Sequence, residues 1–311
     1  MRKFIIDTDT ASDDVIAIIT ALREPSIEVL ALTVVAGNVG LEQSIQNALT
    51  AIKVADTYQP AVYGGMSKPL FRNLFTAADV HGEDGLGNMF LPKSNIPIES
   101  EHAMDALIRL IEEHPYEIEL ITTLGPLTNI AMAALKAPET MNKLKSITLM
   151  AGTGLGPGNT TETAEFNVYV DAEALSIVLG IDVPKLFVGW DVIEKRAFIT
   201  EDDLAHLDNS DSPIAKFAVR CTKSLHDFCK GLGLNGFELA DPTAMICAIW
   251  PEVMTNCIEA HATVETKKEE NYGQIFLDQE SATPNSTTCI DLDGELLKTY
   301  LFNTLLMKEN K

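Results

Sequence analysis

Basic side chains are scarce in this 311-residue chain: 23 lysines and arginines stand against 45 aspartates and glutamates, for a formal charge of −22. A surface of this sign repels phosphate backbones and anionic lipids. The composition therefore argues against a nucleic-acid partner and against recruitment to a membrane surface. It places little constraint on a small, neutral substrate.

Cysteine is also rare, and its spacing excludes further classes of protein. The five cysteines, an odd number without a C-x-x-C pair, favour reduced thiols over a disulfide framework or a zinc site. The chain reaches Asp7 before any secretory-type apolar stretch develops, and no apolar run approaches the length of a membrane span. We therefore expect a cytoplasmic protein.

Positive charge is missing altogether between Lys3 and Arg23, where acidic residues gather. The apolar run Phe4-Ile5-Ile6 is typical of a buried first strand, and it is followed by Asp7-Thr8-Asp9-Thr10-Ala11-Ser12-Asp13-Asp14. Clustered carboxylates raise one another's pKa unless a positive charge neutralises them, and a hard divalent cation is the natural counter-charge. A helix N-terminus rich in acids is the alternative, but it accounts for only one or two of the four aspartates.

Strand-like and helix-like segments alternate through most of the chain. This alternation predicts an α/β fold, an open and mostly parallel sheet flanked by helices, as a single domain over 1–311. The predicted strands are 3–7, 29–36, 61–63, 118–122, 146–150 and 185–188, with a few late strands within 255–292. The predicted helices are 13–23, 41–56, 102–113, 126–137, 171–179, 213–230, 241–250 and 294–308.

Polar residues follow several of the predicted strands, and two loops, 64–98 and 152–168, are longer than a connection requires. Long loops in compact domains are often binding loops or lids. Each polar residue alone is explained by an ordinary turn or cap. Because carboxyl ends of parallel strands share one edge, together they indicate a site there. The set comprises Asn38, Met150, Asn159, Glu165, Asn167 and Asp241.

Other catalytic motifs fit less well. The chain has no G-x-S-x-G segment, which excludes a serine hydrolase of that type. Glycines at 152, 154, 156 and 158 have the wrong spacing for a dinucleotide fingerprint. The D-x-D pattern of Asp7 and Asp9 also occurs in metal-dependent phosphatases, and this alternative stays open.

The chain resembles the nucleoside hydrolases, the calcium-dependent N-ribohydrolases, over nearly its whole length. The most specific motif is D-x-D-x-x-x-D-D at 7–14. Supporting segments are 36–38, 125–129, 164–167 and 241–242, together with the glycine-rich loop around His81. The resemblance implies hydrolysis of the N-glycosidic bond of ribonucleosides to free base and ribose, with a calcium-activated water.

The resemblance also assigns roles to residues. It implies Ca²⁺ held by Asp9, Asp14, the Leu124 carbonyl and Asp241, with Asp9 as the general base. It implies that the ribose hydroxyls are bound by Asp13, Asn38, Asn159, Glu165 and Asn167, and that Met150 lines the ribose floor. Phe166, within the 164–167 segment, is assigned to substrate binding with them.

The chain departs from the family at Ala240, where relatives carry a histidine that protonates the leaving base, or a tryptophan nearby. We expect His81 to be the catalytic acid instead, with His226 and Lys230 as further candidates, and Phe228 to stack on the base. Without an acid, the protein would bind ribosides with little turnover. Asp191 either supports the site or caps the following segment. We expect the substrate to be a small-molecule ribonucleoside. We also expect the chain to form a homodimer or homotetramer.

Overall fold

A nine-stranded sheet forms the centre of the computed structural model, which describes residues 1–307 and, among these, all side chains except those of Thr122 and Thr123. The strands are β1 Arg2–Thr8, β2 Ile27–Val34, β3 Ala61–Gly64, β4 Ile118–Leu124, β5 Ser146–Met150, β6 Lys185–Val188, β9 Met254–Val264, β10 Ile275–Asp278 and β11 Ser286–Leu292. A separate antiparallel pair joins β7 Phe198–Thr200 to β8 Gly236–Glu238.

The sheet order is β10-β9-β11-β6-β5-β4-β1-β2-β3. All neighbours from β11 to β3 pair in parallel, and β9 runs antiparallel to both β10 and β11. The predicted fold class is therefore confirmed. Because β1 is an inner strand, its buried run Phe4-Ile5-Ile6 carries apolar side chains to both faces of the sheet.

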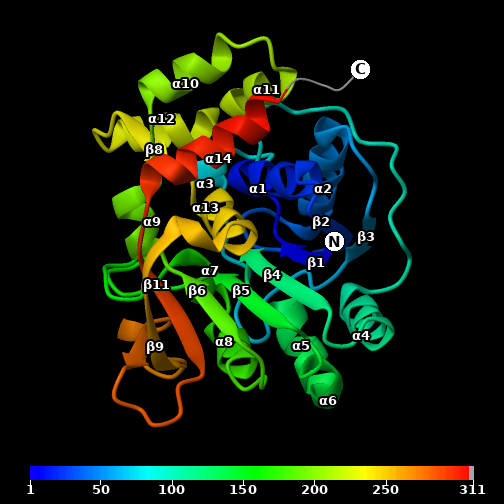
Figure 1. Ribbon diagram of the computed structural model, residues 1–311, viewed down its shortest axis with the longest axis vertical. Coiled ribbons are helices and arrows are strands. Elements are labelled where there is room, and N and C mark those ends of the chain that lie inside the picture. The colour runs from blue at the N-terminus through cyan, green and yellow to red at the C-terminus, as the bar shows by residue number, and fades with distance from the viewer. Residues whose placement is uncertain (308–311) are drawn as a thin grey trace.

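Helices cover both faces, as Figure 1 shows, with α1, α2, α13 and α14 on one side and α4, α5 and α8 on the other. Each face has its own apolar core. The helices are α1 Ser12–Arg23, α2 Leu41–Ala55, α3 Ala78–His81, α4 Ala103–Glu113, α5 Thr128–Lys136, α6 Pro138–Met141, α7 Phe166–Val170, α8 Ala172–Val178, α9 Trp190–Arg196, α10 Glu201–Asp208, α11 Pro213–Cys221, α12 Lys223–Gly231, α13 Ala240–Ile249 and α14 Gly294–Leu306.

The structure contains seven short elements that the prediction lacks, the helices α3, α6, α7, α9 and α10 and the strands β7 and β8. Two of the predicted helices also differ. The segment predicted as one helix over 213–230 is two, α11 and α12, which meet at Thr222. The hydroxyl of Thr222 donates to the Ala218 carbonyl (2.8 Å), and hydrophobic periodicity alone does not show such a local break. The last helix ends at Leu306, and residue 308 of the predicted helix lies outside the described residues.

Among residues 1–307, no helix combines the length and apolar composition needed to cross a bilayer.

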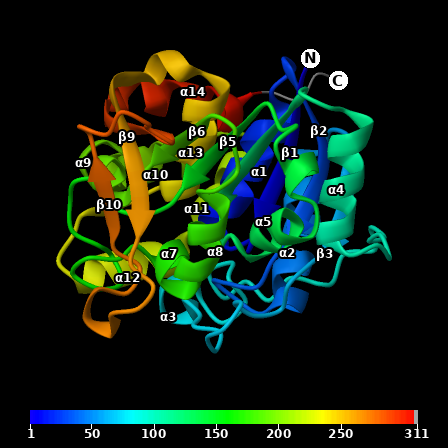
Figure 2. The same ribbon diagram turned by 90° about the horizontal axis from the view of Figure 1, so that it is seen from below.

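The short helices α3, α7 and α12 lie toward the same end of the molecule, where the long loops also run (Figure 2).

Candidate active site

Asp9 lies in the turn that leaves β1, and it is fully buried. Its carboxylate accepts hydrogen bonds from the backbone N–H (2.5 Å) and the side-chain amide (3.1 Å) of Asn38. Its own N–H donates to the Leu124 carbonyl (2.5 Å). A Cβ at position 37 would lie 1.9 Å from the Asp9 carboxylate, so only glycine lets the loop after β2 approach so closely.

Asp14 is held from within its own turn. One carboxylate oxygen accepts from the Thr8 hydroxyl (2.8 Å) and the other from the Ala11 N–H (2.7 Å). Asp14 is the third residue of α1, so the second bond caps the helix, and the negative charge suits the helix N-terminus. The capping interpretation from the sequence and the proposed metal role therefore apply to the same side chain.

Three buried aspartates offer oxygen atoms to one point. Oxygen atoms of Asp13, Asp14 and Asp241 all lie within 4.8 Å of one another, and Asp241 comes from the first turn of α13. One oxygen of Asp13 is buried without a hydrogen-bond partner. Among the described residues, His81 is the one basic side chain within ion-pair distance of these carboxylates or of Asp9. Unpaired, oxygen-only donors of this kind fit a hard cation such as Ca²⁺.

The electrostatics agree with this interpretation. Burial, followed by repulsion from neighbouring aspartates, raises the pKa of Asp9 and Asp241 well above the usual range for aspartate. The same two causes raise the pKa of Asp14 to about 7. Without a positive partner, buried carboxylates this close together favour their protonated forms.

His81, at the end of α3, reaches this cluster. Its Nδ1 lies 2.7 Å from the Ser12 hydroxyl and 3.7 Å from a carboxylate oxygen of Asp13. Burial lowers the pKa of His81, and the charge of Asp13 opposes that shift. The structure thus places the predicted acid beside the aspartates.

Glu165 organises the second long loop. It caps α7 by accepting the N–H groups of Asn167 (2.8 Å) and Val168 (3.3 Å), and it also accepts the Gly152 N–H (2.9 Å). The Asn167 side-chain amide donates to the Met150 carbonyl (3.1 Å) at the end of β5. Burial raises the pKa of Glu165 to about 7, against these hydrogen bonds. The predicted residues Met150, Glu165 and Asn167 are therefore in contact.

Asn159 and Phe166 lie at the outer side of the same loop. The exposed Asn159 accepts the Phe166 N–H (2.9 Å) through its side-chain oxygen. The Phe166 ring packs against Phe75 of the first long loop, with centroids 6.1 Å apart. The two long loops, far apart in the sequence, therefore meet beside the aspartates' sheet edge.

The residues predicted on α12 have partners away from the aspartates. Nε2 of His226 lies 3.8 Å from Glu201, and its ring packs against Phe237 with centroids 5.9 Å apart. Lys230 pairs with Glu201 (3.3 Å). Phe228 is 38% exposed, so its ring is free to meet a ligand.

Two buried acids have supporting roles that the sequence did not resolve. Asp7 accepts from the Thr33 hydroxyl (2.6 Å) and the Asn129 amide (2.8 Å), which joins β1 to β2 and to the first turn of α5. Asp191 accepts the Leu155 N–H (3.1 Å) and so holds the glycine-rich loop. Asn129 belongs to the quoted 125–129 segment, but spacing gives no sign of its partner, 122 residues away.

Known proteins match this chain over nearly its whole length. The family model of the inosine-uridine preferring nucleoside hydrolases matches residues 4–299. A pyrimidine-specific ribonucleoside hydrolase of Salmonella paratyphi C is 34% identical over 296 residues, with 94% of each chain covered. An uncharacterised protein of Schizosaccharomyces pombe is 34% identical over 279 residues and 89% of each chain.

Solved structures of the family have the same fold. A plant nucleoside hydrolase superposes with a TM-score of 0.92 at 29% identity, over 99% of each chain. A purine-preferring ribonucleoside hydrolase from Gardnerella vaginalis superposes with a TM-score of 0.91 at 26% identity, over 98% of each chain. These two structures extend the similarity from the sequence motifs to the complete arrangement of strands and helices.

Proposed function

Because the chain belongs to the inosine-uridine preferring nucleoside hydrolase family, we propose that it cleaves the N-glycosidic bond of ribonucleosides with a water molecule activated by Ca²⁺. The observation that carries the metal part is the meeting of Asp13, Asp14 and Asp241 with no lysine or arginine beside them among the described residues, and with His81 as the one nearby basic group. The family match over 4–299 favours this function over the phosphatase alternative.

We propose that the ion is held by Asp9, Asp14, Asp241 and the Leu124 carbonyl. All four are buried, and the Leu124 carbonyl lies against the Asp9 backbone. When bound, the ion supplies a positive charge that neutralises the carboxylates and lowers the pKa of water in contact with it.

The chain's own residues then orient the reactants. Asp9 is the proposed proton acceptor, and the two bonds from Asn38 hold its carboxylate in one orientation. Asp13 keeps an oxygen free to accept a hydroxyl group. Glu165, Asn167, Asn38 and Asn159 are the other proposed ribose contacts, because a site that hydrogen-bonds a hydroxyl group selects against a sugar that lacks it.

Leaving-group protonation is assigned to His81. Its Nδ1 is occupied by Ser12, which leaves Nε2 as the nitrogen available to a base. Ala240 carries no proton donor, and His226 has Glu201 and Phe237 as its neighbours. Phe228, exposed on α12, is the proposed stacking partner of the base.

Hydrolysis of a panel of ribonucleosides tests the proposal directly. The panel contains both purines and pyrimidines, because the named relatives include pyrimidine-specific and purine-preferring enzymes. We expect release of free base, loss of activity with a chelator and recovery with Ca²⁺. Hydrolysis of p-nitrophenyl phosphate in place of p-nitrophenyl riboside would identify a phosphatase, and riboside binding without turnover would identify a binding protein.

Assembly as a homodimer or homotetramer and a cytoplasmic location stay predictions. Analytical ultracentrifugation of the purified chain measures the first. Fractionation of the cells that express the protein measures the second.

A further inference from the structure

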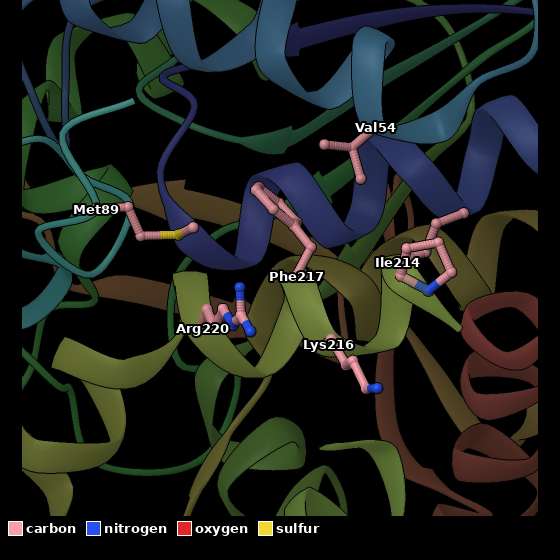
Figure 3. Close-up of a pocket in the computed structure, with 7 residues that line it drawn as sticks. Val54, Met89, Ile214, Lys216, Phe217 and Arg220 are labelled. Atoms are coloured by element: carbon pink, nitrogen blue, oxygen red, sulfur yellow. The ribbon is translucent and has the colours of Figure 1, made fainter. Parts of the chain in front are cut away.

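A pocket of about 370 Å³ lies between α2, α11 and the loop that carries Met89 (Figure 3). Its apolar lining comes from Val54, Met89, Ile214 and Phe217. Figure 3 shows the Phe217 side chain directed away from α11, between Met89 on one side and Val54 on the other. None of the proposed catalytic, ribose-binding or metal-binding residues lines it, and its volume lies in the range of small-molecule sites.

Two cations from α11 complete the lining. Lys216 and Arg220 are one helical turn apart, and neither side chain forms an ion pair or hydrogen bond with any residue in 1–307. The other five arginines are all described, and each guanidinium bonds a carboxylate or a backbone carbonyl. Like charges four residues apart destabilise a helix. The chain has almost twice as many acidic as basic side chains, and yet none of the described acids pairs with Lys216 or Arg220.

We propose that this pocket binds a small amphipathic anion, a planar apolar body that ends in a carboxylate or phosphate group. The body would pack on Phe217, since aromatic rings favour flat, apolar partners. The charged end would pair with Arg220, whose guanidinium is suited to two parallel hydrogen bonds with such a group. Lys216 adds a second positive charge from the same helix.

The pocket is connected to the proposed active site through short contacts. A Cβ at Gly87 would lie 2.7 Å from the Arg220 carbonyl and 2.8 Å from that of Cys221, so loop and helix touch here. The Cys221 thiol lies 3.3 Å from the Ala218 carbonyl and 3.6 Å from the Ser12 carbonyl, so it touches the start of α1. The Ser12 hydroxyl in turn bonds His81 (2.7 Å). An anion held at Arg220 would therefore bind one residue before Cys221, at the end of α11 that touches Ser12.

The loop side of the pocket is firmly held as well. Asp84 accepts the N–H groups of Leu86 (2.8 Å), Asn88 (2.9 Å) and Phe90 (2.6 Å), which fixes the backbone on both sides of Met89. Asn47 joins this loop to the aspartate turn by donating to the carbonyls of Thr10 and Asp84 (both 2.9 Å). A ligand that presses on Met89 is thus coupled to the aspartate turn. The inference goes beyond the proposed function, since the anion would alter the rate without reacting.

Fluorescence titration with 8-anilinonaphthalene-1-sulfonate tests the binding on the full, calcium-loaded chain. This dye has a planar apolar body, and its sulfonate represents the carboxylate or phosphate. We expect saturable binding to wild type, and at least about fivefold weaker binding to Arg220→Gln, because a charged hydrogen bond is lost. The matched control is Arg196→Gln, whose guanidinium pairs with Asp291 outside the pocket, and it should bind as wild type does.

The uncharged analogue N-phenyl-1-naphthylamine separates anion recognition from general apolar binding. Equal binding of both dyes, or equal binding of the sulfonate by wild type and Arg220→Gln, would overturn the proposal. Absent binding together with a dimer that Arg220→Glu dissociates would also overturn it, and would assign this face to a second copy of the chain.

Hydrolysis of p-nitrophenyl riboside tests the coupling. Saturating dye should change kcat or KM at least about twofold in wild type and leave Arg220→Gln unchanged. An unchanged rate in wild type would overturn the coupling and leave the binding result standing. The dye titration measures binding and does not depend on turnover. If the proposed hydrolase function is wrong, the riboside assay will show no activity while the titration still tests the pocket.

Discussion

Individual carboxylates determine whether this site holds a cation. Asp13 keeps one buried oxygen without a partner, whereas both oxygens of Asp14 accept bonds from its own turn. The two adjacent aspartates therefore differ in role: one is free to bind a ligand, and the other also stabilises the start of α1. Asp241 reaches them from the other end of the chain.

Replacing Asp14 by alanine should remove both calcium binding and hydrolysis. We expect affinity for Ca²⁺, measured by isothermal titration calorimetry, to fall at least about a hundredfold, because changes even at residues that only support a metal ligand cost up to this much. Asp202→Asn, an exposed change on α10, is the control and should bind as wild type does. Retention of both calcium and activity in Asp14→Ala would refute the metal assignment.

Replacing His81 by alanine should slow natural nucleosides more than p-nitrophenyl riboside. General-acid catalysis contributes about a hundred- to ten-thousandfold, and a p-nitrophenolate leaving group needs little of it. The measurement is kcat/KM on both substrates, with His226→Ala as the control. If His81→Ala leaves both rates unchanged and His226→Ala does not, the acid lies on α12.

At the scale of elements, short helices bring the polar side chains of the long loops together. Glu165 caps α7 and at the same time bonds Gly152, so the first and last parts of the loop 152–168 are tied to each other. Asp191, from the first turn of α9, holds the middle of that loop at Leu155. The proposed ribose contacts are thereby set before a substrate arrives, which reduces the entropy lost on binding.

This arrangement predicts strict selection for ribose. If Asp13, Asn159, Glu165 and Asn167 bind the sugar hydroxyls, a 2′-deoxyriboside leaves part of this site without its hydrogen-bond partner. We expect kcat/KM to fall by about a thousandfold or more between a ribonucleoside and its 2′-deoxy form. Comparable rates for uridine and deoxyuridine would show that the ribose contacts are assigned to the wrong residues.

Helix α13 begins with Ala240, the position where relatives carry the acid, and continues with Asp241, a proposed metal ligand. Ala240→His should restore a proton donor beside the site and raise kcat/KM selectively for pyrimidine nucleosides. We expect a gain of about a hundredfold or more, the contribution typical of general-acid catalysis. The comparison substrate is p-nitrophenyl riboside, which should gain little. A uniform change on all substrates would indicate altered folding or metal binding.

For the whole molecule, the buried acids link stability to pH and to the metal. In metal-free protein the folded pKa of Asp14 is raised from 3.8 to about 7, so the folded state binds more protons than the unfolded state between these values. Stability must then fall as pH rises through this window. We expect the Tm of chelator-treated protein to be lower at pH 7.5 than at pH 5.

Calcium should remove most of that fall, because a ligand that binds only the folded state stabilises it by mass action. Differential scanning fluorimetry with and without Ca²⁺ measures both effects. The control is Asp14→Asn, which lacks the titrating group and should show a weaker dependence of Tm on pH without metal. A pH-independent Tm in chelator-treated wild type would contradict the raised pKa.

Local sequence patterns were sufficient to predict the fold class and to indicate where the proposed site lies. Apolar runs alternating with helical periodicity are local properties, and they predicted most strands and helices within a few residues. The aspartate motif directly after β1 indicated the sheet edge, because ligands bind at the carboxyl ends of parallel strands. It did not reveal the break at Thr222, because the buried apolar positions keep their helical spacing from α11 into α12.

Only the tertiary structure decided which side chains meet. Asp13 and Asp241 are more than two hundred positions apart, and Asp7 and Asn129 are 122 apart, so no local pattern records either contact. The sequence also did not show the neighbours of the two histidines. His81 lies beside Asp13, and His226 lies beside Glu201. Hydrophobic periodicity indicates which residues share one face of a helix or strand. The contacts between distant residues depend instead on how those helices and strands pack together.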